Sequence, residues 1–207
     1  MAAAKVTPFI EADDLGLLKG HQVYLEFLTP AHREILRPLA RDERIWEFTK
    51  TLLITETYDQ QFDDYFDQAL SFAARGDQAF AIVATDGSVI GMTRAYDIDR
   101  KVKKVTIGHT WYVPEVWGKA ANKECKLLLL QYVFDTLGLA RVDFKVAGQN
   151  LRSQKAVAKI GAVKEGVLRR FALRNDGTPA DTVIFSMLDD EWPENKRRLQ
   201  EMVAELG

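Results

Sequence analysis

The chain has 207 residues, of which 47% are hydrophobic and 28% are charged, and these proportions are typical of a soluble globular protein rather than a disordered or fibrous one. Its 28 basic and 30 acidic residues give a formal charge of −2, which is too balanced for a protein that coats nucleic acid. We expect a leader at residues 1–19 and one domain over residues 20–207, with no nucleic-acid partner.

Cysteine and histidine are scarce. Cys125 is the single cysteine, which excludes an internal disulfide and a zinc site built from several cysteines, and only His21, His32 and His109 could offer imidazole ligands. No apolar run approaches the ~20 residues of a membrane-spanning helix. The sequence therefore predicts a cytoplasmic protein that binds neither a metal nor a membrane.

The first half of the chain predicts a strand, two helices and an antiparallel meander. Residues 21–28 alternate as a strand does, Thr29-Pro30 begins a helix, and a second helical stripe over 59–75 stops at Gly76. Three strands are then expected at residues 79–84, 89–97 and 104–113, the first two joined by Asp86-Gly87 and the last ended by Pro114.

The second half predicts helices and strands in alternation. We expect a long helix at 118–137, a strand at 141–146, a helix at 151–160, a hairpin of 163–173 with 182–188, and a last helix from Glu191. This order predicts a mixed α/β sheet of about seven strands with flanking helices. The sheet is antiparallel at first and has a parallel junction where the long helix crosses over.

The segment 111–122 is the most informative part of the chain. A strand ends there, a short loop with Gly118 and small residues follows, and a long helix begins. A helix start has backbone N–H groups without partners and the positive end of the helix dipole, so it can bind a phosphate, and Lys119 would add charge. A loop glycine that merely begins a helix, followed by alanines that favour helix, is the alternative.

This segment resembles the pyrophosphate loop of the GNAT N-acetyltransferases, whose pattern is Gln or Arg, two residues, Gly, one residue, and Gly or Ala. Glu115, Gly118 and Ala120 occupy these positions, and the acidic Glu115 departs from the pattern. The surrounding motifs resemble the RimJ/RimL-type branch, named for ribosomal-protein N-acetyltransferases. These motifs are IGHTWY at 107–112, NKECKLLLL at 122–130, NLRS at 150–153, IGA at 160–162, EGVLR at 165–169 and EWP at 191–193.

The resemblance implies a GNAT fold in which the parallel junction splays and acetyl-CoA lies in the split as cosubstrate. It implies pantetheine contacts with Trp111, Tyr112 and Val113, and coenzyme contacts with Asn150 and Ser153. It places the pyrophosphate on the backbone of Gly118, Lys119, Ala120, Ala121 and Asn122. An Asn150 that caps the next helix, with Ser153 in its first turn, is an equal alternative and is compatible with this role.

The resemblance also implies direct attack of an amine on the thioester in a ternary complex, with a backbone N–H near Val113 as the oxyanion donor. Cys125 is then no nucleophile, and its helical position predicts a core residue. Many family members carry a tyrosine as thiolate acid seven positions after the asparagine, where this chain has Val157. Ser153 matches the serine that serves instead in the RimL-like pattern, and a capping hydroxyl or a water are the alternatives.

The general base is left open by the sequence. Thr106 stands where the branch often has an acidic residue, and a hydroxyl cannot take up a proton at neutral pH. His109, with an ordinary pKa of ~6.5, is our candidate, and a structural histidine is the alternative. Glu115 and Asp181 are further candidates, although an α-amine of pKa ~7.7 to 8.0 needs no strong base.

The sequence therefore predicts an N-acetyltransferase whose acceptor is a primary amine of a protein N-terminus or a small molecule, with a homodimer left open. Aromatic residues are candidates for the acceptor pocket, with core packing as the alternative: Trp46, Phe48, Tyr96, Trp111 and Tyr112. Two rival functions remain. One is an acyl-CoA-binding protein without turnover, suggested by Glu115, Thr106 and Val157, and the other is an acetyltransferase that inactivates amine antibiotics.

Overall fold

The computed structural model describes residues 17–205 and contains one mixed sheet of eight strands, in the order β1-β2-β3-β4-β5-β6-β8-β7. Among the strands of the described residues, only β5 and β6 are parallel, so the expected mixed sheet with one parallel junction is confirmed, with eight strands instead of about seven. The strands are β1 Leu17–Lys19, β2 Val23–Phe27, β3 Gln78–Ala84, β4 Val89–Asp99, β5 Lys104–Tyr112, β6 Arg141–Ala147, β7 Val163–Leu173 and β8 Pro179–Leu188.

The additional strand is β1, which pairs antiparallel with β2 and lies within the segment expected to be a leader. The rest of that segment, residues 1–16, lies outside the described residues. The sheet thus begins at Leu17, before the predicted domain boundary at residue 20. Three residues are too few for a period-two pattern to stand out in a sequence, and their pairing with β2 decides their conformation.

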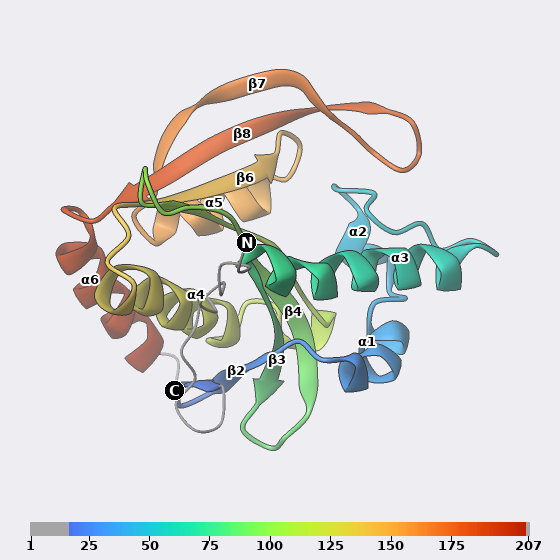
Figure 1. Ribbon diagram of the computed structural model, residues 1–207, viewed down its shortest axis with the longest axis horizontal. Coiled ribbons are helices and arrows are strands. Elements are labelled where there is room, and N and C mark those ends of the chain that lie inside the picture. Colours follow the sequence, from blue (N-terminus) through green and yellow to red (C-terminus); the bar gives the residue numbers. More distant parts are fainter. Residues whose placement is uncertain (1–16, 206–207) are drawn as a thin grey trace, which may run out of the picture.

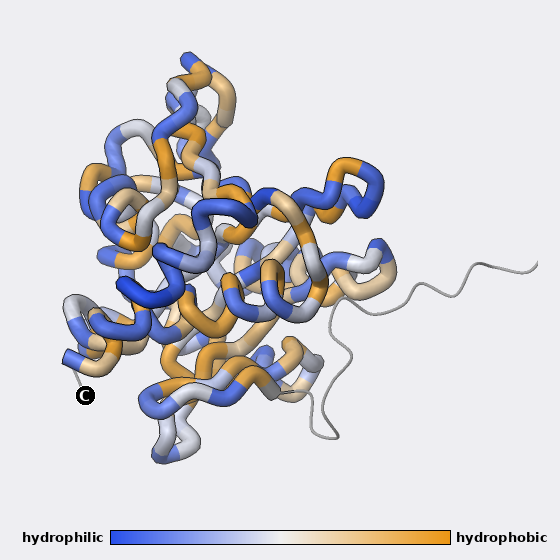
Figure 2. Tube along the Cα trace, turned by 90° about the vertical axis from the view of Figure 1, so that its left-hand side faces the viewer, coloured by the Kyte–Doolittle hydropathy of each residue, from blue (hydrophilic) through white to orange (hydrophobic). Residues whose placement is uncertain are grey.

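Helices cover both faces of the sheet (Figure 1). They are α1 Arg33–Leu39, α2 Glu43–Trp46, α3 Tyr58–Ser71, α4 Ala121–Gln131, α5 Leu151–Lys159 and α6 Trp192–Ala204. One core cluster joins the strands to α4, α5 and α6, and a second joins β3, β4 and β5 to α1, α2 and α3. The apolar segments run through the interior of the molecule and the polar ones lie at its outer turns (Figure 2).

Every predicted strand and helix is present, and α2 is a helix that the sequence did not predict. The long helix begins at Ala121 rather than at Gly118, because Gly118 has a φ of 77° that a right-handed helix does not use. A single 3-10 turn at Pro114–Val116 connects β5 to it, and a π-helical turn at Tyr132–Thr136 follows it. Of residues 17–205, none belongs to a helix long and apolar enough to cross a bilayer.

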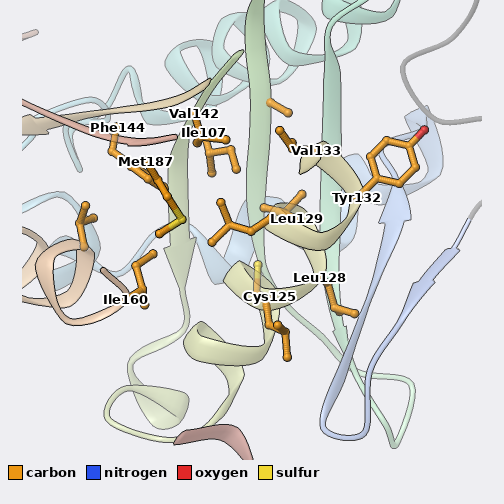
Figure 3. Packing of buried hydrophobic residues seen from close by; sticks show 14 of the residues in the cluster. Ile107, Cys125, Leu128, Leu129, Tyr132, Val133, Val142, Phe144, Ile160 and Met187 are labelled. Carbon is orange, nitrogen blue, oxygen red and sulfur yellow. The ribbon is translucent and has the colours of Figure 1, made fainter. Parts of the chain in front are cut away.

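The larger core lies between α4 and the central strands. Figure 3 shows Cys125 and Leu129 of α4 facing the sheet, with Ile107 of β5, Phe144 of β6 and Met187 of β8 on the other side. All five side chains are at most 2% exposed. The helix is therefore fixed against the same two strands that form the parallel junction.

The β7–β8 hairpin is the most exposed part of the sheet and arches over β6 (Figure 1). Its tip reaches the loop after α2, where the backbone N–H of Asn175 donates to the carbonyl of Lys50 at 3.2 Å and the guanidinium of Arg174 donates to the carbonyl of Phe48 at 3.3 Å. Apolar side chains remain exposed along β7, such as Phe171 and Leu173. The homodimer that the sequence left open stays a prediction.

Candidate active site

The parallel junction between β5 and β6 opens after three residue pairs. The pairs are Lys104 with Arg141, Val105 with Val142 and Thr106 with Asp143. β5 continues to Tyr112 and β6 to Ala147, yet no further pair joins these two strands. The separated carboxyl-terminal halves of the strands form a split, and such a point in an open sheet is where α/β folds bind ligands.

A β-bulge at His109 bends β5 where the split opens. Met92 pairs with Trp111 and Arg94 with Gly108, so β5 has one residue more than β4 between these pairs. His109 takes a φ of 49° at this point. An extra residue turns a strand and re-aims its side chains, which explains how β5 leaves β6 while it stays paired with β4.

The backbone of Tyr112, not that of Val113, faces the split. The N–H of Val113 donates to the carbonyl of Ile90 at 2.9 Å, so it points toward β4. Residues of an antiparallel strand direct their N–H groups to alternate sides, and Tyr112 therefore turns its own N–H away from β4. The Tyr112 carbonyl accepts the indole N–H of Trp117 at 3.0 Å.

The start of α4 carries backbone donors without acceptors at the mouth of this split. Within residues 17–205, no acceptor receives the N–H groups of Gly118, Ala120, Ala121, Asn122 or Lys123. A Cβ added to Gly118 would meet nothing within 4 Å, and Lys119 is exposed. The predicted anion site therefore has open space, free donors and a nearby cation.

Sequence reasoning missed one contact that bridges the mouth of the split. The guanidinium carbon of Arg152, on α5, lies 4.1 Å from the ring centroid of Trp117. This cation–π pair joins the loop after β5 to the helix after β6. The two residues are 35 positions apart in the sequence, and only the motifs to which they belong could have suggested this contact.

Asn150 caps α5, as one of the two interpretations expected. Its side-chain oxygen accepts the backbone N–H of Ser153 at 2.9 Å, which fixes both residues at the first turn of the helix. Val157 is buried in the larger core, so no polar side chain comes from that position. The roles of Asn150 and Ser153 toward a coenzyme stay predictions.

Cys125 lies in the core as predicted. The residue is 0% exposed, and burial raises the pKa of its thiol above the ordinary value. A thiol is a poor nucleophile while it keeps its proton, so this environment favours a structural cysteine. Thr106 is also buried, at the last residue pair before the strands separate.

His109 lies on the opposite face of the sheet from α4, beside two tyrosines. Its ring centroid is 5.3 Å from that of Tyr96 and 6.4 Å from that of Tyr65, although part of the residue stays open to solvent. Desolvation by this surrounding protein lowers the pKa of His109 below its ordinary value, and the charge of Arg94 adds to the shift. The imidazole is thus neutral at neutral pH and a weaker base than free histidine.

This shift predicts an acid-sensitive contribution to stability. Below pH ~6.5 the unfolded chain takes up a proton on His109 that the folded chain does not, so the free energy of unfolding falls as the pH falls. Replacing His109 with asparagine, which tolerates a positive φ, should flatten this slope between pH 6.5 and pH 4. Urea unfolding of both proteins across this range measures it, and equal slopes would contradict the shift.

Two tryptophans lie close together next to this histidine. The ring centroids of Trp46 and Trp111 are 5.8 Å apart and both residues are buried. The indole N–H of Trp111 and the hydroxyl of Tyr65 have no hydrogen-bond partner among the described side chains and backbone. Buried polar groups are normally paired, so this cluster offers two donors to an incoming group.

The structure brings together only some of the aromatic candidates. Tyr96 contacts His109 edge-to-face on this side, whereas the hydroxyl of Tyr112 donates to the side chain of Asn122 at 3.2 Å, on the α4 side. Phe48 is half-buried in the loop that the hairpin tip contacts. Trp46, Trp111 and Tyr96 are therefore the candidates that share one side of the sheet.

The remaining acidic candidates have other partners or positions. The Asp181 carboxylate, on β8, accepts the backbone N–H of Arg170 at 2.7 Å, where the register between β7 and β8 shifts. Glu115 is exposed in the 3-10 turn before α4. The described part of the chain holds no group of three His, Cys, Asp or Glu side chains that could bind a metal ion.

Fold and geometry together define a mixed α/β protein whose sheet opens at its single described parallel junction. Residues 22–163 match the family described as acetyltransferase (GNAT) domain, and the chain belongs to this family. The resemblance to GNAT proteins that the sequence suggested is confirmed.

Curated relatives support the same family. The chain is 33% identical over 100 residues to the uncharacterized N-acetyltransferase YoaA of Bacillus subtilis, a match that covers 48% of this chain and 55% of YoaA. It is 30% identical over 123 residues to the uncharacterized N-acetyltransferase p20 of Bacillus licheniformis, covering 59% of this chain and 68% of that protein. The match to YoaA thus spans about half of that relative's length.

Solved structures share the fold. A GCN5-related N-acetyltransferase from Brucella melitensis is 27% identical with a TM-score of 0.80, covering 91% of this chain and 86% of that one. Spermidine N-acetyltransferase from Vibrio cholerae, in complex with CoA and spermine, is 19% identical with a TM-score of 0.68, covering 83% and 98%. RimJ of Mycobacterium smegmatis, with CoA-disulfide, is also 19% identical, with a TM-score of 0.74, covering 87% and 88%.

Proposed function

We propose that this protein is an acetyl-CoA-dependent N-acetyltransferase that acetylates a primary amine by direct attack in a ternary complex. The observation that carries the proposal is the split between β5 and β6 with the free backbone donors of α4 at its mouth. A long, flexible coenzyme with a pyrophosphate near one end and a thioester at the other suits such a site. Family membership supports the same chemistry.

The residues present fit this cosubstrate. The free N–H groups of Gly118, Ala120, Ala121 and Asn122 would bind the pyrophosphate, with Lys119 adding charge. The backbone at Trp111, Tyr112 and Val113 borders the split and would pair with the pantetheine amides. Asn150 and Ser153 would form the opposite wall, at the first turn of α5.

Several groups are placed for the transfer itself. We assign the oxyanion contact to the N–H of Tyr112, because the N–H of Val113 is bonded to Ile90. His109 is the candidate base near the bulge. Because its lowered pKa makes it a weak base, the proposal relies on an acceptor amine that is already partly neutral. Ser153 remains the candidate acid that the resemblance suggested.

The acceptor would enter on the side of Trp46, Trp111 and His109, under the tip of the β7–β8 hairpin. Aromatic walls with a few unpaired donors are typical of small polar ligands and of peptide ends. An amine of a protein N-terminus or a small-molecule amine fits this description. The spermidine enzyme with the same fold shows that a polyamine belongs in the test panel.

The experiment is a titration with CoA by calorimetry, followed by release of free thiol from acetyl-CoA in the presence of an amine panel. The panel contains peptides with free N-termini, spermidine and an aminoglycoside. We expect CoA binding and thiol release with at least one class of amine. Absence of CoA binding would reject the proposal.

The rival function, an acyl-CoA-binding protein without turnover, is favoured by three observations at the site. Glu115 lies beside the proposed phosphate-binding loop, Thr106 stands where the resemblance leads us to expect an acid, and Val157 is buried in the apolar core. Tight binding of CoA without acetylation of any amine in the panel would support this rival. Thiol release with an aminoglycoside alone would point to antibiotic acetylation.

A further inference from the structure

Lys126 is a buried lysine that the proposed function has not used. It lies in α4, one residue after Cys125, and the residue is 7% exposed. Its Nζ donates to the Thr110 hydroxyl at 3.0 Å and lies 5.9 Å from the ring centroid of Phe144. Thr110 belongs to β5 and Phe144 to β6.

These two contacts place Nζ at the split. The last residue pair between the strands is Thr106 with Asp143, and both Thr110 and Phe144 come after it. The ammonium group therefore approaches the separated strands from the α4 side, as the neighbouring Cys125 and Leu129 do in Figure 3. Nζ lies between β5, which would bind pantetheine, and β6, which follows α4 in the chain.

The charge of Lys126 is incompletely satisfied. An ammonium group has three N–H donors, and the Thr110 hydroxyl is the one acceptor that residues 17–205 offer it. No carboxylate of the described chain forms an ion pair with Nζ. Thr110 is itself fixed, because its hydroxyl lies 2.7 Å from that of the fully buried Thr93. Two donors are left for a group that enters the split.

We propose, on the basis of the function proposed above, that the Lys126 ammonium group, rather than the Ser153 hydroxyl, donates the proton to the CoA thiolate as it leaves. When the amine nitrogen attacks, a C–N bond forms and the C–S bond breaks, and the sulfur keeps the electron pair. Sulfur then takes a proton from Nζ and becomes CoA thiol. The new amide nitrogen releases one proton, which restores Lys126 through solvent, so that no proton is gained or lost.

The surroundings of Lys126 favour this role. The position where many family members carry a tyrosine is the apolar Val157, and the larger core contains Val157 together with Phe144 and Cys125. Desolvation lowers the pKa of Lys126 from its ordinary value, which makes its ammonium group a stronger acid. The neighbouring Cys125 thiol has the opposite effect and raises the pKa of Lys126.

Other ionisable groups near Lys126 are engaged elsewhere. On α4, the Glu124 carboxylate accepts three backbone N–H groups of residues 21–23. On β5, the buried Tyr112 hydroxyl is bonded to Asn122, and burial raises its pKa. On β6, Asp143 pairs with Arg141, and Lys145 pairs with Asp97. Lys126 is thus the cation that α4 brings to the split.

The test compares the protein with Lys126→Met and Lys126→Arg. Bound CoA is titrated by the ultraviolet absorbance of its thiolate, and affinity is measured for CoA and for desulfo-CoA, which has no thiol. We expect bound CoA to ionise at lower pH than free CoA, an effect lost in Lys126→Met and kept in Lys126→Arg. Both variants should lose about 100-fold in kcat, because the guanidinium does not release its proton.

A positioning or structural role would give a different pattern. The proposal requires desulfo-CoA to bind both variants within about threefold of the original protein, and Lys159→Met, at an exposed position of α5, to change nothing. An unchanged thiol pKa and kcat in Lys126→Met would overturn it, as would equal losses of CoA and desulfo-CoA affinity. If Lys126→Met does not fold, Lys126→Arg becomes the deciding variant, because a kcat in Lys126→Arg equal to that of the original protein would overturn the proposal. Failure of the unmodified protein to bind desulfo-CoA would instead reject the proposed function.

Discussion

Replacing Gly118 with glutamate is expected to abolish CoA binding. The residue has a φ of 77° and open space around its Cα, next to the free N–H groups at the start of α4. A glutamate would bring a carboxylate to the position proposed for the pyrophosphate, and like charges in such a site cost several kcal/mol. We expect the dissociation constant for CoA, measured by calorimetry, to rise by more than about 100-fold, which corresponds to about 2.8 kcal/mol.

Gly138→Glu is the matched control for this variant. Gly138 also has a positive φ, of 61°, and no atom within 4 Å of an added Cβ, but it follows the far end of the same helical segment. Both substitutions should lower the free energy of unfolding by about 1 to 2 kcal/mol through backbone strain. CoA affinity that falls equally in both variants, or in neither, would contradict the proposed phosphate site.

Truncating Glu124 to alanine is expected to have the largest effect on stability. Its carboxylate accepts the backbone N–H groups of His21, Gln22 and Val23 at 2.7, 2.6 and 2.8 Å, and the residue is 2% exposed. These bonds hold the turn between β1 and β2 against α4. Because hydrogen bonds to a charged group contribute about 1.5 to 3 kcal/mol each and two of these donors can reach water, we expect a loss of about 3 kcal/mol.

Urea unfolding followed by circular dichroism measures this loss. Glu124→Gln keeps one oxygen acceptor and should lose about half as much, because one neutral amide oxygen replaces two charged ones. Glu194→Ala is the surface control, since Glu194 forms an ion pair with Arg197 at 2.7 Å that is exposed to solvent and should contribute little to stability. A Glu124→Ala protein as stable as Glu194→Ala would show that the bonds to residues 21–23 contribute nothing.

Local patterns in the sequence predicted most of the secondary structure. Period-two alternation located β2 and β5, the Asp86-Gly87 turn located the hairpin of β3 and β4, and the glycines after α3 and α5 marked where those helices end. The four-residue helix α2 and the three-residue strand β1 were not predicted, because elements this short show no periodic pattern. The start of α4 was placed three residues early, since the sequence does not reveal the left-handed conformation of Gly118.

The candidate site was predicted only in part. The residues of the phosphate loop and the cap at Asn150 follow from local sequence, because a helix start has the same free donors wherever it occurs. The orientation of the Val113 N–H depends on its register with Ile90 in β4, which is a tertiary property. The sequence predicted a backbone donor near Val113, and the register with β4 leaves the N–H of Tyr112, not that of Val113, turned away from β4.

The order of strands and helices, the single core cysteine and the loop between β5 and α4 were determined by the sequence itself, since each follows from local spacing and residue type. Only the tertiary structure decided which groups meet at the split. Lys126 and Thr110, which are in contact, are 16 residues apart in the chain. Two other contacting pairs, Trp117 with Arg152 and Trp46 with Trp111, are still farther apart in the chain. Such contacts depend on how α4 packs on the sheet and on the bulge at His109, which are set by the whole core.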